Sequence, residues 1–282
     1  MEFDKMINTI QLGDCYELIE KIPNNSIDLV IIDPPYEYTT GKGGGAFGNE
    51  HRQYHDEYSK VSVNSEELLK KYLDKGFDRK KAQTWADKEK SRLDISHISS
   101  GFDYGLLDVL DAKMKHIYIY IWCSKWQVEP LLKHYIDKNC NFDILTWHKS
   151  NPAPTMNNTY ANDTEYLIMA REKGTKLFGD YHSKKKYWIT NTNKDDKEKY
   201  KHPTIKPINI IKTLIENSSQ ENDIVLDCFC GSGTTCIASK ELGRRFIGFE
   251  IDPQYFKIAI DRLNGIDACG QTSIFTNFDE ME

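Results

Sequence analysis

The sequence predicts an α/β fold, in which a largely parallel β-sheet is covered by helices on both faces. Two observations lead to this prediction. Short runs of β-branched and aromatic residues alternate with longer segments of helical period along most of the chain. Several of these runs are apolar at every position, which is typical of strands buried between two layers of helices.

Seven segments are predicted to be strands. In chain order they are 7–12, 27–32, 117–122, 142–147, 165–170, 223–229 and 245–251. Helical periodicity occupies much of the sequence between and after them, at 15–22, 124–138, 207–217, from Thr234 onward, and at 254–263. The regular alternation favours parallel strands joined by helical crossovers.

Two stretches interrupt this alternation. Residues 41–100 begin with the glycine-rich run GKGGGAFG and continue as a charged segment of helical period. We interpret them as a helical insertion into a single domain that spans residues 1–282. Residues 172–201 are polar and rich in lysine, and no regular structure is predicted there.

Composition narrows the classes of protein that remain. The 282 residues carry a net charge of −6, so a nucleic-acid partner would have to be held by a local patch. The seven cysteines are odd in number and scattered, and the sequence has neither a signal peptide nor a membrane-spanning run. We therefore expect a cytoplasmic protein with free thiols, no metal site and no membrane contact.

A glycine loop marks the first candidate site. The run LDCFCGSGTT, residues 226–235, lies where a strand leads into a helix, and ligands of open α/β sheets bind beyond such strand ends. A phosphate-cradling loop is excluded because no lysine follows the glycines, and a dinucleotide fingerprint lacks its third glycine, where Cys236 stands. The next strand ends at Glu250, which could accept both hydroxyls of a ribose or simply be an exposed acid. A nucleoside site is the better interpretation.

Together with other motifs, this loop resembles a known family. DPPY at 33–36, DCFCGSGTT at 227–235 and FIGFEID at 246–252 are similar to motifs of the amino-methylating DNA methyltransferases, the N6-adenine/N4-cytosine DNA methylases, which use S-adenosylmethionine. Residues 11–36, 147–172 and 202–207 resemble further motifs of that family. Because the catalytic motif precedes the cofactor motif, the chain resembles the circularly permuted β group. The resemblance implies a Rossmann-like methyltransferase fold with a mostly parallel, seven-stranded sheet. One departure is Cys228, where the family usually has proline.

The resemblance implies a catalytic set made of Asp33, Pro34, Pro35 and Tyr36. The exocyclic amine of a base is a poor nucleophile, and acceptors for its hydrogens stabilise the positive charge that develops during attack. The Asp33 carboxylate and the Pro34 carbonyl would be those acceptors, because the two prolines fix φ near −65°. Tyr36 would stack on a base lifted from the duplex. No metal is required.

The resemblance also implies the cofactor site. Asp227 would receive the ammonium of the methionine part, Glu250 the ribose hydroxyls, and Asp14 the adenine amine. His202 and Lys206 would approach the carboxylate, although a surface turn and a solvated lysine are credible alternatives for them. The full expected set is Asp14, Cys15, Asp33, His202, Lys206, Asp227, Phe229, Gly231, Ser232, Gly233, Thr234, Thr235 and Glu250.

DNA contacts are expected in two places. Trp147, Asn151 and Pro152 would line the base pocket, although a core aromatic and a plain turn explain them equally well. Residues 171–206 hold eleven Lys or Arg against five Asp or Glu, and the permuted group keeps its target-recognition region here, at 172–201. A lysine run is also commonly a solvated face. The expected substrate-binding residues are Tyr36, Trp147, Asn151, Pro152, Lys184, Lys185 and Lys186.

The predicted activity is site-specific methylation of the N6 amine of adenine in duplex DNA, with base flipping, by a bacterial or phage-encoded enzyme. Aspartate rather than serine at position 33 favours adenine over the N4 amine of cytosine. Methylation of RNA or of a protein glutamine is a rival activity, and a non-catalytic DNA-binding protein that retains the cofactor fold is a rival of another class. A cognate restriction nuclease and a homodimer are left open as partners.

Overall fold

The protein divides into two compact units, one formed by residues 1–34 and 103–282 and the other by residues 35–102. The computed structural model describes residues 2–36, 65–84, 86, 102–152, 154, 158, 160–202, 204–267 and 269–270. Most of the expected insertion at 41–100 lies outside the described residues. The first unit holds the sheet and nearly all of the predicted site residues.

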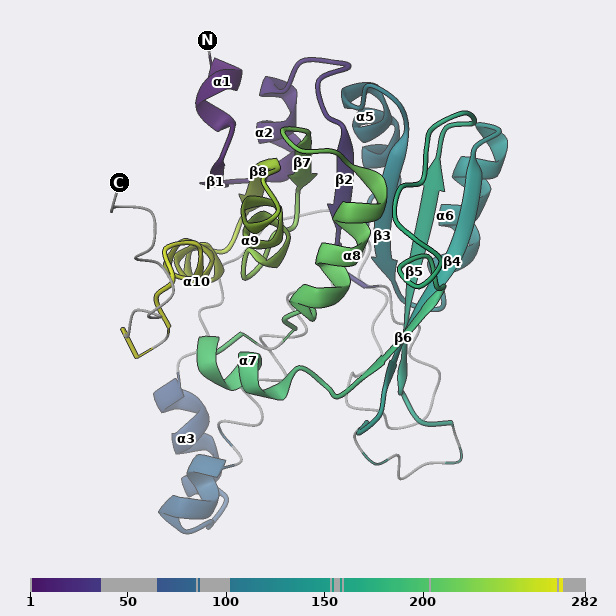
Figure 1. Ribbon diagram of the computed structural model, residues 1–282. Helices are drawn as coiled ribbons and strands as arrows, with labels where there is room; N and C mark the ends of the chain where they lie inside the picture. The colour runs from purple at the N-terminus through teal and green to yellow at the C-terminus, as the bar shows by residue number, and fades with distance from the viewer. Residues whose placement is uncertain are drawn as a thin grey trace, which may run out of the picture. The chain divides into compact units, whose positions relative to one another are not determined.

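The first unit is built on an eight-stranded sheet (Figure 1). Neighbouring strands run in parallel except at β5, which is antiparallel to both β3 and β4. The sheet is therefore mostly parallel, as the sequence predicts. In spatial order its strands are β1 (Thr9–Leu12), β8 (Arg245–Glu250), β7 (Ile224–Asp227), β2 (Leu29–Ile32), β3 (Tyr118–Cys123), β5 (Thr164–Arg171), β4 (Asn141–Lys149) and β6 (Tyr187–Thr190).

Helices cover both faces of this sheet. In Figure 1, α8 and α9 lie in front of it, and α5 and α6 lie behind it. Every residue of β2, β3 and β7 is consequently buried, which explains why these strands are apolar runs rather than alternating ones. The helices of this unit are α1 (Glu2–Met6), α2 (Cys15–Leu18) with the 3-10 turn η1 (Ile19–Lys21), α5 (Gly105–Lys113), α6 (Val128–Asp137), α7 (Lys194–Tyr200), α8 (Ile208–Ser218), α9 (Thr234–Glu241) and α10 (Pro253–Leu263).

Local sequence signals start three helices directly beyond strand ends. Asp14 follows β1 and caps α2 by accepting a hydrogen bond from the Tyr16 N–H. Asp252 follows β8 and caps α10 in the same way, with Pro253 as the first helical residue. Gly233 leads β7 into α9 with φ +77°, a conformation that a side chain rarely adopts. These short connections keep the strand ends and the polar residues beyond them at one edge.

Within residues 172–201 the structure adds β6 and α7, which the sequence does not predict. The helices α1 and α5 are also not among the predicted ones. β6 is a short strand at the edge of the sheet and is mostly exposed, so it lacks an apolar run. α7 has the sequence KDDKEKY and buries no residue, so it lacks an apolar stripe. The sheet consequently has eight strands where seven are predicted.

The second unit contains α3 (Ser65–Asp74) and a helical segment at 79–84. Gly76 ends α3 with φ +81°, and the Phe77 N–H donates to the Tyr72 carbonyl. The rings of Tyr72 and Phe77 also meet edge to face, with centroids 6.0 Å apart. That residues 41–100 form a helical insertion stays a prediction. Among the described residues, no helix combines the length and apolarity needed to cross a membrane.

Candidate active site

Four acidic residues lie along one edge of the sheet, beyond the carboxyl ends of four adjacent parallel strands. Glu250 and Asp227 are the last residues of β8 and β7, Asp33 follows β2, and Asp14 follows β1 by two residues. The register pairs Leu12 with Glu250, so these strands end at the same level. The sequence separates Asp33 from Asp227 widely, yet the fold sets their strands side by side.

Glu250 anchors the glycine loop. Its Oε2 accepts a hydrogen bond from the Gly231 N–H at 2.8 Å, and its Oε1 accepts one from the Asp252 N–H at 2.8 Å. The side chain is buried, and burial raises its pKa above the ordinary value. Each carboxylate oxygen offers a second lone pair, so Glu250 can accept further donors such as ribose hydroxyls.

Asp227 is a second buried acceptor at this edge. Its Oδ1 accepts from the Phe229 N–H at 3.0 Å. Burial raises the pKa of Asp227 to about 7, and the nearby carboxylates of Asp33 and Glu250 act in the same direction. A nearby cation stabilises the ionised form of such a buried carboxyl group. Asp227 is therefore suited to bind an ammonium group.

The loop between Asp227 and α9 passes very close to its neighbours. Gly231 has φ +51°, and a Cβ atom there would stand 3.3 Å from His202 Nε2. Gly233 has φ +77°, and a Cβ atom there would stand 3.1 Å from Ala259 Cβ. Both backbone conformation and space therefore require glycine at these two positions.

His202 faces this loop as a neutral imidazole. Burial lowers its pKa to about 3, and the positive charges of Arg262 and Lys206 contribute. The ring packs on Tyr255 with centroids 4.3 Å apart, and its Nδ1 accepts from the Thr204 N–H at 3.3 Å. The neutral ring therefore carries its proton on Nε2, the nitrogen nearest Gly231.

Arg262 of α10 holds the loop from the other side, which the sequence does not predict. Its Nη1 donates to the Ser232 carbonyl at 2.6 Å, to Ser232 Oγ at 2.8 Å and to Thr234 Oγ1 at 3.1 Å. The guanidinium also stacks over Tyr200 of α7, 4.5 Å from the ring centroid. An arginine near the end of an amphipathic helix looks like a surface residue, so no sequence signal separates it from one.

The residues at this edge fit the cofactor that the motifs imply. Asp14 and Glu250 can accept from an adenine amine and from ribose hydroxyls, and Asp227 can accept an ammonium. The close-packed glycine loop brings backbone N–H groups to the same edge. Ser232, Thr234, Thr235 and Cys15 are buried beside these acids. Their individual roles stay predictions.

Lys206 contacts Asp33 rather than standing alone. Its Nζ lies 2.7 Å from Asp33 Oδ2 and 3.0 Å from Glu165 Oε2. Lys149 Nζ lies 2.6 Å from the other oxygen, Glu165 Oε1. Neither Glu165 nor Lys149 is predicted from the sequence, because Glu165 falls inside a run that reads only as a strand.

The four residues expected to be catalytic, 33–36, are divided between the two units. Asp33 and Pro34 belong to the first unit and Pro35 and Tyr36 to the second. Asp33 is partly buried and Pro34 is buried. The expected stacking of Tyr36 on a base stays a prediction.

The residues expected to contact DNA lie in different settings. Trp147 is 1% exposed, donates from Nε1 to Thr190 Oγ1 at 2.7 Å and meets Trp122 edge to face, which are the contacts of a core aromatic. Asn151 Oδ1 accepts from the Thr192 N–H at 2.6 Å, so it ties the ends of β4 and β6 together. Pro152 follows it and is half-buried.

The three consecutive lysines of the expected DNA-contact region do not lie at the sheet edge that carries the four acids. Lys184, Lys185 and Lys186 are exposed and precede β6, whereas the edge is reached at Thr190. The strand spacing places Lys186 about 13 Å back from that end. Lys186 also forms an ion pair with Asp143 of β4. Their contact with DNA stays a prediction.

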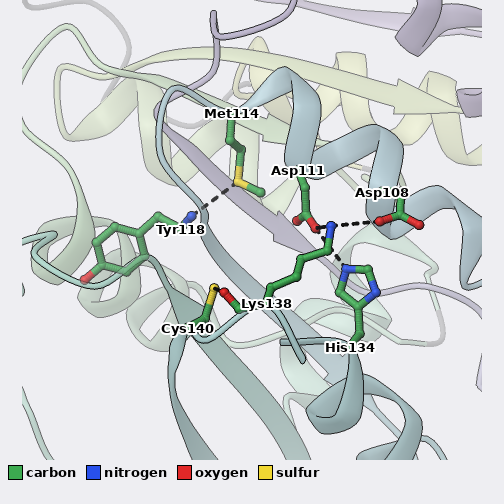
Figure 2. Close-up of polar contacts among 7 residues, drawn as sticks. All are labelled: Asp108, Asp111, Met114, Tyr118, His134, Lys138 and Cys140. Atoms are coloured by element: carbon green, nitrogen blue, oxygen red, sulfur yellow. Dashed lines mark hydrogen bonds and ion pairs between the residues drawn. The ribbon is translucent and has the colours of Figure 1, made fainter. Parts of the chain in front are cut away.

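A second charged cluster joins α5 to α6 (Figure 2). Asp108, Asp111 and His134 have the spacing of metal ligands, with their ligand atoms within 4.8 Å of one another. Lys138 Nζ, however, lies 2.7 Å from Asp108 Oδ1 and 2.6 Å from Asp111 Oδ2. His134 Nε2 lies 2.9 Å from the same Asp111 oxygen. This cluster is an ion-pair clamp between two helices.

Comparison with known proteins agrees with this geometry. Residues 27–261 match the family model for a DNA methylase of the N6/N4 class. The type II methyltransferase M2.LlaDCHI of Lactococcus lactis subsp. cremoris is 30% identical over 89% of this chain and 87% of its own length. The type II methyltransferase M.HinfI of Haemophilus influenzae is 31% identical over 92% of this chain and 69% of its own length.

Solved structures share the fold. The M1.HpyAVI–SAM complex aligns with a TM-score of 0.59 at 24% identity, over 91% of this chain and 98% of that one. The cytosine-N4-specific PvuII DNA methyltransferase aligns with a TM-score of 0.58 at 17% identity, over 90% and 85%. The chain therefore belongs to the N6/N4 DNA methylase family, with the Rossmann-like methyltransferase fold and the S-adenosylmethionine cofactor that its motifs predict.

Proposed function

We propose that this DNA methyltransferase transfers a methyl group to the N6 amine of adenine within a specific short sequence of duplex DNA. The observation that carries the proposal is the position of Asp33, a carboxylate held at the carboxyl edge by Lys206 Nζ at 2.7 Å. It lies on the strand next to Asp227 and the glycine loop. An acceptor for the target amine and a cofactor site thus share one edge of the sheet.

In this mechanism Asp33 and the Pro34 carbonyl accept hydrogen bonds from the two N–H groups of the target amine. Their negative charge stabilises the positive charge that grows on the nitrogen as it attacks. S-adenosylmethionine supplies an electrophilic methyl group on a sulfonium. Asp227 and Glu250 fix the bound cofactor through its ammonium and its ribose, and His202 and Arg262 keep the loop beside them in place. Tyr36 stacks on the flipped base.

Positive charge beyond the acids supports a DNA substrate at this edge. Lys197 lies close enough to Lys149 and Lys206 for their charges to lower its pKa, although burial lowers it most. These lysines lie among the carboxylates of this edge, and in this proposal they meet phosphate groups of the DNA. Cytoplasmic location, a homodimer and a cognate nuclease remain predictions.

The choice of adenine over cytosine rests on Asp33 itself. The fold does not discriminate, because the PvuII enzyme shares it and is named as cytosine-N4-specific. Aspartate before Pro-Pro-Tyr favours adenine in families of this kind. The two amines are chemically alike, so the modified base has to be identified directly.

The test is to express the chain in a host that lacks DNA methylation and to identify the modified nucleoside. Hydrolysed genomic DNA analysed by mass spectrometry should contain N6-methyladenine, and modified-base sequencing should place it in one motif. Asp33→Ala should abolish the product, whereas Asp137→Ala, which removes an exposed acid of α6, should not. If N4-methylcytosine is found instead, the target is the N4 amine of cytosine and not the N6 amine of adenine. Unmodified DNA would overturn the proposal.

A further inference from the structure

Lys149, Glu165, Lys206 and Asp33 form a row of alternating charges at the active-site edge. Lys149 ends β4, Glu165 is the second residue of the antiparallel neighbour β5, and Lys206 precedes α8. The Glu165 carboxylate uses one oxygen for each lysine, at 2.6 Å from Lys149 and 3.0 Å from Lys206. Lys206 spans from Glu165 to Asp33, at 2.7 Å. Residues far apart in the sequence thus converge on the proposed catalytic carboxylate.

This row is well shielded from solvent. The side chain of Lys206 is 10% exposed, and that of Glu165 is 18% exposed. Burial alone would lower the pKa of Lys206, but the carboxylates of Asp33 and Glu165 more than offset it and hold that pKa well above its ordinary value. Burial would likewise raise the pKa of Glu165, but Lys206 and Lys149 hold it at about 2. Lys206 and Glu165 are therefore both charged at neutral pH.

The Lys206 ammonium contacts an aromatic ring as well as two carboxylates. Lys206 Nζ lies 5.0 Å from the ring centroid of Trp122, a fully buried residue of β3. Trp122 meets Trp147 edge to face at 6.3 Å, and Lys149 lies over Trp147 at 5.2 Å. A lysine side chain has four flexible bonds, and one carboxylate does not fix its direction. The second carboxylate and the ring below determine where the ammonium lies.

We propose that Glu165 is a positioning residue for methyl transfer, which holds the Lys206 ammonium against Asp33 and thereby fixes the orientation of the catalytic carboxylate. This inference rests on the proposed role of Asp33 as acceptor for the target amine. Alignment of the acceptor matters because a displacement of about 1 Å near the reacting atoms can cost about 100-fold in rate. Lys149 in turn anchors Glu165 from the side away from Lys206.

A purely structural ion pair would give a different pattern of effects. Removal of Glu165 would then lower the stability of the protein whether or not Lys206 is present. It would not selectively lower kcat. A positioning role acts through Lys206, so its loss should appear in kcat rather than in KM. It should also disappear once Lys206 is gone, since effects of coupled residues are not additive.

The experiment is single-turnover and steady-state methyl transfer from radiolabelled S-adenosylmethionine to methylation-free plasmid DNA. The variants are Glu165→Gln, Glu165→Asp, Lys206→Met and the double variant Glu165→Gln/Lys206→Met. The matched control is Asp137→Asn, which removes an exposed acid of α6 that pairs with Lys133. Circular dichroism at the assay temperature confirms that each variant is folded.

We expect Glu165→Gln to lower kcat by about 10- to 100-fold, with the KM for DNA and for cofactor within about 2-fold of wild type. Glu165→Asp should restore part of the rate, because it keeps the charge. The double variant should be no slower than Lys206→Met alone, and Asp137→Asn should match wild type. If Glu165→Gln unfolds, Glu165→Asp and its double variant with Lys206→Met carry the same comparison.

Three results would overturn the inference: an unchanged kcat in Glu165→Gln, a loss confined to KM, or additive losses in the double variant. Each of these presupposes an active wild type and therefore leaves the proposed function standing. A wild-type protein that transfers no methyl group to DNA would instead remove the proposed function, and the inference with it.

Discussion

Proton release on cofactor binding should report directly on Asp227. Burial raises the pKa of this carboxyl to about 7, so a large share of the molecules carry a proton there at neutral pH. If Asp227 receives the cofactor ammonium, only its ionised form binds well. Binding should then expel the proton, and the apparent affinity should weaken as pH falls below 7.

The magnitude follows from that pKa. The affinity of a ligand that requires the ionised form falls by a factor of about 11 at pH 6 and about 2 at pH 7, relative to high pH. Between pH 8 and pH 6 the apparent Kd should therefore rise about tenfold, which corresponds to about 1.4 kcal/mol. An ordinary aspartate, ionised throughout this range, would give no change.

The assay is isothermal titration calorimetry with S-adenosylmethionine in two buffers of different ionisation enthalpy. Near pH 7, about half a proton should be released per cofactor bound. Asp227→Asn should bind more weakly and with little dependence on pH between 6 and 7. Asp261→Asn, which removes a half-buried acid that pairs with Lys257 on α10, should keep the wild-type slope.

Two results would refute the reasoning. A wild-type affinity that is constant between pH 6 and 8 would mean that Asp227 does not meet the ammonium. The same pH slope in Asp227→Asn as in wild type would assign the proton to another acid, of which Glu250 is the nearest with a raised pKa.

Three further predictions concern other parts of the fold. Arg262→Met should lose the hydrogen bonds to Ser232 and Thr234, weaken cofactor binding by about tenfold and lower the melting temperature. The affinity of Arg262→Lys should lie between those of Arg262→Met and wild type. Equal affinity in all three proteins would contradict this role. The folded-state pKa of His202 is about 3, below its unfolded value near 6.5, so the unfolded state binds a proton first and stability should fall by up to about 1.4 kcal/mol per pH unit as pH drops from 6.5. Urea unfolding from pH 6.5 to 4.5 should show a flatter slope for His202→Gln, and parallel curves would refute the assignment. Lys138→Met should destabilise the clamp between α5 and α6 by about 1 kcal/mol at pH 7, as urea unfolding can check, and an unchanged free energy of unfolding would contradict it.

The sequence could predict the strand-end acids because local patterns mark them. Asp33 and Asp227 each terminate an apolar run that only a doubly covered strand would have, and Glu250 does the same on β8. Parallel strands end at the same edge of a sheet, so this pattern predicts that the acids lie together. The structure brings Asp14, Asp33, Asp227 and Glu250 to one edge in that way.

The missed residues depend on contacts between distant segments. Glu165 and Lys149 gain their importance from antiparallel pairing of β4 with β5 and from the approach of Lys206, which no local pattern encodes. Arg262 looks like any polar residue of an amphipathic helix until the loop is seen to bind it. β6 is not predicted because an exposed edge strand needs no apolar face, so its sequence lacks the pattern of a buried strand.

The order of strands also bears on how the chain is made. β2 lies between β3 and β7, and Asp28 at its start accepts a hydrogen bond from the Ile224 N–H, 196 residues later. At roughly 5–20 residues per second of synthesis, β7 emerges about 10–40 s after β2. For all that time one side of a fully buried strand lacks its neighbour. The edge that carries the candidate active site can therefore be completed only late in the synthesis of the chain.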